Sequence, residues 1–404
     1  MPNLVRAVDS QEAVSNRFAL FDYGFRPFFL LAGLYAAAIV PIWLYLHVHH
    51  AATFGALPAM YWHSHEMLFG FVCAAIAGFL LTAVPSWNNM RGFAGLPLMG
   101  LVAVWLGGRI AMATVGNAPF WLMAAVELAF VPSLAALVAP ALIRNANRNT
   151  PLLGVLAALW IIDALFLVAL KGGDAALATR AISLAIDFVL VLVTVISGRI
   201  VPSFTANALR RRGDTANIVS HDWLEKTLVG LMIAVAIVDV FAPTALWSGL
   251  LAVLAAAAHS YRLSGWLSFK TRGEPILWVL HLAYAWLPIG FVLKACWLLG
   301  GLEFAMKWQH ALAAGVFATM ILAVMTRVSL GHTGRPLVVR SAITGTYLLL
   351  TLSILGRVFG GSLWPHHYVL AISVAGIAWM SSFLIYLAFY VRILVRPRAD
   401  GKPG

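Results

Sequence analysis

Charged residues are scarce in this sequence, and their scarcity excludes most soluble folds. Only 10% of the 404 residues are charged, whereas 62% are hydrophobic and the mean hydropathy is +0.90. An average soluble domain is about half apolar and about a quarter charged. The composition therefore excludes a soluble single-domain enzyme and a disordered chain. A lipid bilayer is the expected surrounding of most of this chain.

Cysteine and long polar segments are also lacking. The two cysteines, Cys73 and Cys296, lie far apart inside apolar stretches, which excludes a disulfide scaffold and gives no metal-binding spacing. No loop between the apolar runs is long enough for a soluble domain. The net charge of +12 does not gather on a soluble face, so we expect no nucleic-acid partner. The basic run at 210–212 is expected to be a solvated loop or to contact lipid headgroups.

What the sequence has in abundance is hydrophobic runs of membrane-spanning length. A transmembrane helix needs about 20 mostly apolar residues. Twelve runs meet that length, and they predict an all-α, polytopic membrane protein with about twelve transmembrane helices. The expected spans are 28–47, 62–85, 96–115, 118–143, 151–170, 176–200, 224–242, 245–263, 275–300, 307–330, 341–358 and 366–394.

Lysine and arginine outside these spans predict the orientation. They gather in the termini and the even-numbered loops, whereas the odd-numbered loops carry only Lys171 and Lys307. The positive-inside rule then places both termini in the cytoplasm. The expected organisation is a cytoplasmic segment at 1–27, a transmembrane domain at 28–394 and a cytoplasmic tail at 395–404. The polar start of the chain does not resemble a cleavable signal peptide.

Six of the twelve histidines fall at two depths of the expected bundle. The predicted orientation gives the direction in which each span crosses the membrane. It therefore places three of these histidines near the outer face and three near the cytoplasmic face. The outer trio is His63, His65 and His310, and the inner trio is His259, His281 and His332. Imidazole is a common ligand of haem iron, copper and zinc, so these six residues are the candidate metal ligands and cofactor-binding residues.

His63 and His65 are about 200° apart around a helix axis, so they would serve two centres or an unwound turn. Gly70 would let a flat macrocycle approach the backbone. The simpler interpretation is a polar helix start beside Glu66. Four basic residues map to the outer halves or outer ends of their spans and are candidate partners for haem propionates or an anionic substrate, although each could also reach the headgroups: Arg109, Arg180, Lys294 and Arg357.

Acidic residues inside the spans fit two kinds of protein. They are Glu66, Glu127, Asp163, Asp187 and Asp239. A redox reaction that consumes protons would need such groups, and so would a proton-coupled transporter. Some of them could instead pair with an intramembrane arginine. A faint internal likeness also relates Trp62, His65 and Gly70 to Trp308, His310 and Gly315, which is weak evidence for duplication.

Several longer strings resemble the NnrS family of bacterial membrane proteins. They are DYGFRPFF at 22–29, WHSHEMLFGFVCAAIAGFLLTAVPSW at 62–87, GRIVPSFT at 198–205, LHLAYAWLPIG at 280–290, the stretch that begins at His310 and MTRVSLGHTGRPL at 325–337. The resemblance implies a haem- and copper-containing protein of the bacterial cytoplasmic (inner) membrane that is linked to nitric oxide and denitrification. It implies haem, expected to be of the b type, and copper at the six histidines, without assigning a metal to each.

The expected function is therefore nitric oxide metabolism or resistance to nitrosative stress, with reduction of nitric oxide as the concrete reaction. Nitric oxide is the expected ligand, the bilayer is a partner, and the electron donor is unknown. The outer trio is expected to be the ligand-reactive or copper site, and the inner trio a second haem centre. The alternatives are a proton-coupled secondary transporter and a haem-binding sensor or trafficking protein without turnover.

Overall fold

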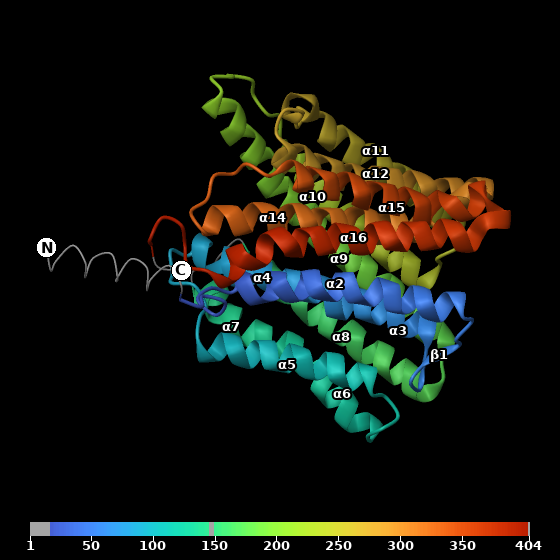
Figure 1. The fold of residues 1–404 in the computed structure, drawn as a ribbon. Coiled ribbons are helices and arrows are strands. Elements are labelled where there is room, and N and C mark those ends of the chain that lie inside the picture. Colours follow the sequence, from blue (N-terminus) through green and yellow to red (C-terminus); the bar gives the residue numbers. More distant parts are fainter. Residues whose placement is uncertain (1–16, 145–148, 403–404) are drawn as a thin grey trace, which may run out of the picture.

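The computed structural model describes residues 17–144 and 149–402, and nearly all of them lie in helices (Figure 1). The predicted all-α class is confirmed for this part of the chain. The exception is a small antiparallel hairpin of β1 (Thr53–Phe54) and β2 (Leu57–Pro58). Most of the expected segment 1–27 and the last two residues of the expected tail lie outside the described residues.

The first half of the chain forms helices at each of the first six expected spans. They are α2 (Phe25–Val48), α3 (Ala59–His65) with η1 (Glu66–Val72) and α4 (Cys73–Trp87), α5 (Leu96–Ala113), α6 (Phe120–Leu128) with α7 (Phe130–Arg144), α8 (Pro151–Gly172) and α9 (Ala175–Arg211). The last of these is longer than expected, because the helix continues through Pro202 where a loop was predicted to begin after residue 200.

The second half of the chain also forms a helix at each of the remaining six expected spans. It comprises α10 (Asp222–Phe241), α11 (Leu246–Ser264), η2 (Ser268–Thr271), α12 (Pro275–Gly300), η3 (Glu303–Ala305), α13 (Trp308–His310) with η4 (Ala311–Ala318) and α14 (Thr319–His332), α15 (Ser341–Leu363), η5 (Pro365–His367) and α16 (Tyr368–Val395). Helix ends follow local signals. Asp174 accepts a hydrogen bond from Leu177 N at 2.9 Å and caps α9, and Gly301 ends α12 in the left-handed conformation (φ 62°).

Ten helical segments of the described chain are long and apolar enough to cross a membrane. The other two of the twelve predicted spans correspond to α10 and α11, which do not meet that criterion. Helix α10 carries four charged residues, Asp222, Glu225, Lys226 and Asp239. Helix α10 packs on α9, and α11 packs on α12, so both belong to the bundle. The protein is therefore a multi-pass, all-α membrane protein.

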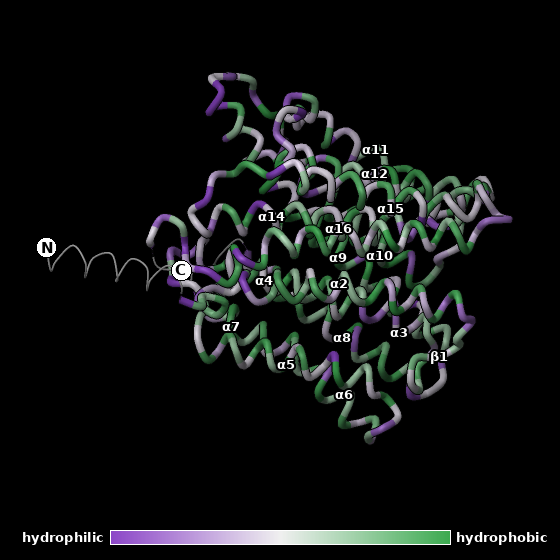
Figure 2. Tube along the Cα trace, viewed as in Figure 1, coloured by the Kyte–Doolittle hydropathy of each residue, from purple (hydrophilic) through white to green (hydrophobic). Residues whose placement is uncertain are grey.

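Large apolar side chains cover the outside of the bundle. Ile110, Val168 and Leu352 lie within helices and are 62–64% exposed. Figure 2 shows that hydrophobic residues run along the helices, whereas hydrophilic residues gather at the end where α4, α7 and α14 terminate. Contiguous exposed apolar surface of this kind is what a bilayer covers and what water does not tolerate.

The two ends of the described chain meet on one side of the bundle (Figure 1). Ala19 N donates to Val395 O at 2.8 Å, which joins the segment before α2 to the last residue of α16. The Arg26 guanidinium donates to the carbonyl oxygens of Leu394 at 2.8 Å and Arg396 at 2.7 Å. The start of α2 and the end of α16 are therefore on the same side, as an even number of crossings requires.

Candidate functional site

Two of the predicted histidines face a common cavity in the half of the bundle away from the chain ends. The cavity has a volume of about 180 Å³. His63 from α3 and His310 from α13 line it, together with Arg357 from α15 and Trp43 from α2. The rest of the wall is almost entirely apolar and includes Phe71, Phe317 and Trp379. A few polar groups in an apolar cavity are typical of a cofactor or ligand site.

Polar atoms in this cavity lack partners. His63 Nδ1 and Arg357 Nη1 are buried and have no hydrogen-bond partner among the described residues. Both side chains contact Trp43: the His63 ring lies 4.7 Å from its ring centroid, and the Arg357 guanidinium lies 5.5 Å from it. Buried polar groups are nearly always paired with protein, water or ligand, so these two atoms are available to a group bound in the cavity.

Two π-helices position the histidines of this site. The π-helix η1 starts directly after His65, and η4 starts directly after His310. A π-helix is rare, and it is frequently found at functional sites because it changes which side chains share a face. The faint sequence likeness between the two spans is thus matched by a shared backbone irregularity.

Glycine occupies the fifth position of both π-helices. A Cβ at Gly70 would lie 2.5 Å from the Tyr35 ring and 3.0 Å from Arg109 Nη1, and a Cβ at Gly315 would lie 2.8 Å from the Trp286 ring. Close side-chain approach therefore requires glycine at both positions. The space beside Gly70, which the sequence suggested for a macrocycle, is filled by Tyr35 and Arg109.

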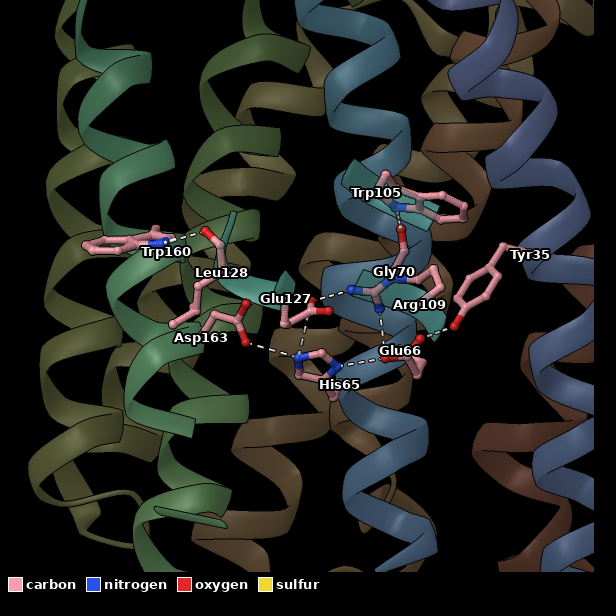
Figure 3. Close-up of polar contacts among 10 residues, drawn as sticks. All are labelled: Tyr35, His65, Glu66, Gly70, Trp105, Arg109, Glu127, Leu128, Trp160 and Asp163. Atoms are coloured by element: carbon pink, nitrogen blue, oxygen red, sulfur yellow. Dashed lines mark hydrogen bonds and ion pairs between the residues drawn. The ribbon is translucent and has the colours of Figure 1, made fainter. Parts of the chain in front are cut away.

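His65 turns away from the cavity into a buried ion cluster (Figure 3). Its Nδ1 lies 2.8 Å from Glu66 Oε1, and its Nε2 lies 3.0 Å from Asp163 Oδ1 and 3.7 Å from Glu127 Oε1. Arg109 Nη1 donates to Glu66 Oε1 at 2.7 Å and also pairs with Glu127. We call these five residues, His65, Glu66, Arg109, Glu127 and Asp163, the ion cluster; all are buried.

Neighbouring helices hold the ion cluster in place. Tyr35 of α2 donates a hydrogen bond to Glu66 Oε2. Trp105 donates to the carbonyl of Gly70 at 3.2 Å, and Trp160 donates to the carbonyl of Leu128 at 2.9 Å, next to the break between α6 and α7 (Figure 3). The indoles satisfy carbonyl groups beside these two helix irregularities.

A family model for NnrS protein matches residues 19–398, nearly the whole chain. The chain belongs to the NnrS family. No curated protein matches it. Membership supports a membrane protein related to nitric oxide in the broad sense, and it agrees with the resemblance read from the sequence.

The inner histidines of this NnrS chain do not form the predicted trio. His259 has Tyr284 Oη 2.6 Å from Nδ1 and Met232 Sδ 3.4 Å from Nε2. His281 has the hydroxyls of Thr205 and Ser268, each 2.9 Å from a ring nitrogen. Both rings are thus engaged by their own neighbours.

His332 lies apart from the other two inner histidines. It packs beside Tyr23 and Phe25, with ring centroids 5.8 Å and 5.9 Å away. The structure therefore does not bring the three inner histidines to one common set of neighbours. Depth along a span does not fix the direction in which a side chain points around the helix, and His332 points toward the start of α2.

The structure distinguishes between two of the arginines that were candidate partners for haem propionates. Arg109 pairs with Glu66 and Glu127 and does not line the cavity, so Arg357 is the arginine placed for an anionic group there. Glu127 and Asp163 were considered as relay groups or as partners of an intramembrane arginine, and their place beside His65 Nε2 was not predicted. The signal that could have brought them together is their similar depth to Arg109 in neighbouring spans.

Proposed function

We propose that this chain is an inner-membrane haem protein that acts on nitric oxide, with its haem bound in the cavity between His63 and His310. The observation that carries the proposal is this cavity, in which two imidazoles from separate helices and an arginine face an apolar space. Membership of the NnrS family supports the link to nitric oxide. The haem type expected from the family resemblance is b.

The residues of the cavity fit haem in their chemistry. Imidazole nitrogen is the common protein ligand of haem iron, so His63 and His310 are the candidate ligands. Arg357, with its unpartnered Nη1, would pair with the propionates. The cavity is smaller than the ~300–1,000 Å³ typical of sites for large organic ligands. A macrocycle therefore requires lining side chains to move outward.

A second apolar cavity offers room for that movement. It has a volume of about 80 Å³ and adjoins the first at Val72 and Phe317, which line both. Its other walls come from α4, α9 and α14 and include Ile76 and Val193. Nitric oxide is small and nearly apolar, so a space with these walls suits its passage from the bilayer to the histidines.

Copper requires a different donor set. His259 and Met232 offer an imidazole nitrogen and a thioether sulfur 3.4 Å apart, and soft sulfur ligands favour copper(I). Tyr284 Oη, which accepts from Arg262 Nη1 at 3.1 Å, can also accept from His259 Nδ1 and leave Nε2 free as a ligand. We propose this pair as the copper ligands.

Bound haem supplies an iron that binds nitric oxide and exchanges electrons. Reduction of two nitric oxide molecules to nitrous oxide and water consumes two electrons and two protons, and the electrons must come from a separate donor. The apolar walls of the cavity exclude water. The chain's own contribution is to hold the iron through imidazole and to balance the propionates through Arg357.

We also propose twelve spans with both termini in the cytoplasm, and the bacterial inner membrane as the location. The pairing of α10 with α9 and α11 with α12 supports twelve, and the positive loops support the orientation. A fluorescent protein fused after residue 402 is expected to fluoresce in cells, and alkaline phosphatase fused there is expected to be inactive. The opposite pair of results would contradict the orientation.

A proton-coupled transporter is the second candidate function, and the ion cluster is the observation that favours it. Buried acids and bases within spans are typical of proton relays. A haem-binding sensor or trafficking protein is the third, and it differs only in lacking turnover. One experiment distinguishes the main proposal from both of these alternative functions.

That experiment is an absorption spectrum of the purified protein with copper quantification. We expect a Soret band in the oxidised and reduced protein, a shift of that band when nitric oxide is added, and consumption of nitric oxide by the reduced protein. A spectrum without haem bands in protein purified from haem-replete cells would contradict the proposal and favour the transporter. Haem bands without consumption would favour the sensor.

A further inference from the structure

The ion cluster contains a set of side chains with the arrangement of a metal site. One ligand atom each from His65, Glu127 and Asp163 lie within 4.8 Å of one another, and all three residues are buried. Within residues 17–144 and 149–402, no other group of three His, Cys, Asp or Glu residues meets that criterion. The three ligands come from α3, α6 and α8, so the fold and not a local motif brings them together (Figure 3).

The formal charges of the ion cluster do not balance. Three carboxylates, of Glu66, Glu127 and Asp163, face a single guanidinium, that of Arg109, and the five side chains are 0–7% exposed. With all carboxylates ionised, two negative charges remain. Buried charges without compensation are costly. A divalent cation between His65, Glu127 and Asp163 removes this excess.

The hydrogen bonds of His65 place a lone pair where that cation would lie. Glu66 Oε1 accepts from Arg109 Nη1, and as a carboxylate oxygen it also accepts from His65 Nδ1 across 2.8 Å. In the neutral ring with this tautomer, Nε2 carries a lone pair. That lone pair faces the oxygens of Asp163 at 3.0 Å and Glu127 at 3.7 Å. A positive centre among these three atoms would then stabilise the arrangement.

The two oxygens of the Glu127 carboxylate have different surroundings. Oε1 pairs with Arg109 and lies 3.7 Å from His65 Nε2, whereas Oε2 is buried beside Gly108 and has no hydrogen-bond partner among the described residues. Figure 3 shows the Glu127 carboxylate between Arg109 and His65. The arrangement Glu66–His65–metal also matches a recurring feature of metal sites, in which a carboxylate orients the ligand histidine through its second nitrogen.

We propose that His65 Nε2, Glu127 and Asp163 bind a divalent first-row metal ion, with Glu66 as the positioning residue. One nitrogen and two oxygen ligands suit manganese(II), iron(II) or zinc(II) and do not suit copper(I), which prefers sulfur. The ion is distinct from the haem proposed at His63 and His310 and from the copper proposed at His259 and Met232. The inference does not depend on the proposed function.

The test is metal analysis of the purified full-length protein. After removal of loosely bound ions with chelator, we expect about one manganese, iron or zinc ion per chain beyond the haem iron and the copper. Glu127→Gln and Asp163→Asn keep the side-chain shape and are expected to lower this content at least about tenfold. Asp187→Asn is the matched control, because Asp187 is also buried and has an unpartnered oxygen.

Two further measurements make the result decisive. Manganese(II) added to protein from which a strong chelator has also stripped this ion is expected to give a bound signal by electron paramagnetic resonance in the unchanged protein and in Asp187→Asn, and none in Glu127→Gln. His63→Ala is expected to change haem and leave this ion in place. Unchanged protein that is monodisperse by gel filtration, yet holds no such ion and binds no manganese(II), would overturn the proposal and assign the positive centre to a proton.

Discussion

Replacing His63 or His310 with alanine is expected to remove most of the haem from the purified protein. Both imidazoles line the same cavity, and its other polar groups, Gln309 and Arg357 among them, are poor substitutes as iron ligands. Truncation at either position also enlarges an existing cavity without breaking a hydrogen bond at His63 Nδ1, which has no partner. The loss should therefore concern haem binding more than folding. The measurement is the haem-to-protein ratio.

The control for this prediction is His332→Ala. His332 is of the same residue type and lies beside Tyr23 and Phe25, outside the cavity. Its haem content is expected to match the unchanged protein. Imidazole added to His63→Gly during haem loading is expected to restore part of the Soret band, since the space left by the side chain admits it. Full haem content in both His63→Ala and His310→Ala would show that haem does not bind in this cavity.

Arg109→Met is expected to destabilise the protein strongly. The substitution keeps much of the side-chain volume and leaves the buried carboxylates of Glu66 and Glu127 without their guanidinium. Removing one partner of a buried ion pair costs about 3–5 kcal/mol, because the remaining charge stays buried and unpaired. The measurement is unfolding in detergent by heat or denaturant. A poor yield of folded protein is the expected extreme of the same effect.

A double-mutant cycle separates this electrostatic effect from lost packing. Arg109→Met combined with Glu127→Gln is expected to cost less than the sum of the two single substitutions, because the second removes a charge that the first left unpaired. Arg396→Met is the control on an arginine outside the cluster, and its expected change in stability is small. Additive effects at Arg109 and Glu127 would show that their contact contributes no coupling energy.

The bundle itself could be predicted from the sequence because span length and hydropathy are properties of consecutive residues. Each of the twelve expected runs contains a helix. The loop after residue 200 was placed too early, since Arg199 and Pro202 look like a helix end while the backbone continues to Arg211. Hydropathy indicates which residues lie within the bilayer. It does not indicate where a helix that continues out of the bilayer ends.

The site was only partly predictable for a related reason. The sequence gives the depth of a histidine, and His63 and His310, which were grouped by depth, line the same cavity. It does not give the rotation of a side chain about its helix, so His259, His281 and His332 were grouped although they have separate neighbours. The π-helices after His65 and His310 change that rotation locally, and no composition signal marks them.

Part of the ion cluster could be predicted by combining the depth of each residue in its span with its charge. Glu66, Arg109, Glu127 and Asp163 lie at similar depth in neighbouring spans, and opposite charges at one depth tend to pair. That reasoning predicts a contact between Arg109 and an acid. It does not predict that His65 turns its Nε2 toward two of the acids, because this requires the geometry of three helices.

The most direct test of the central claim is the structure of the purified, haem-loaded protein by electron cryomicroscopy, at a resolution that shows side chains. The account predicts density for the macrocycle between α3, α13 and α15, with imidazole of His63 or His310 on the iron and Arg357 beside the propionates. Macrocycle density elsewhere, for example at His259 and His281, with the His63 cavity empty, would contradict it.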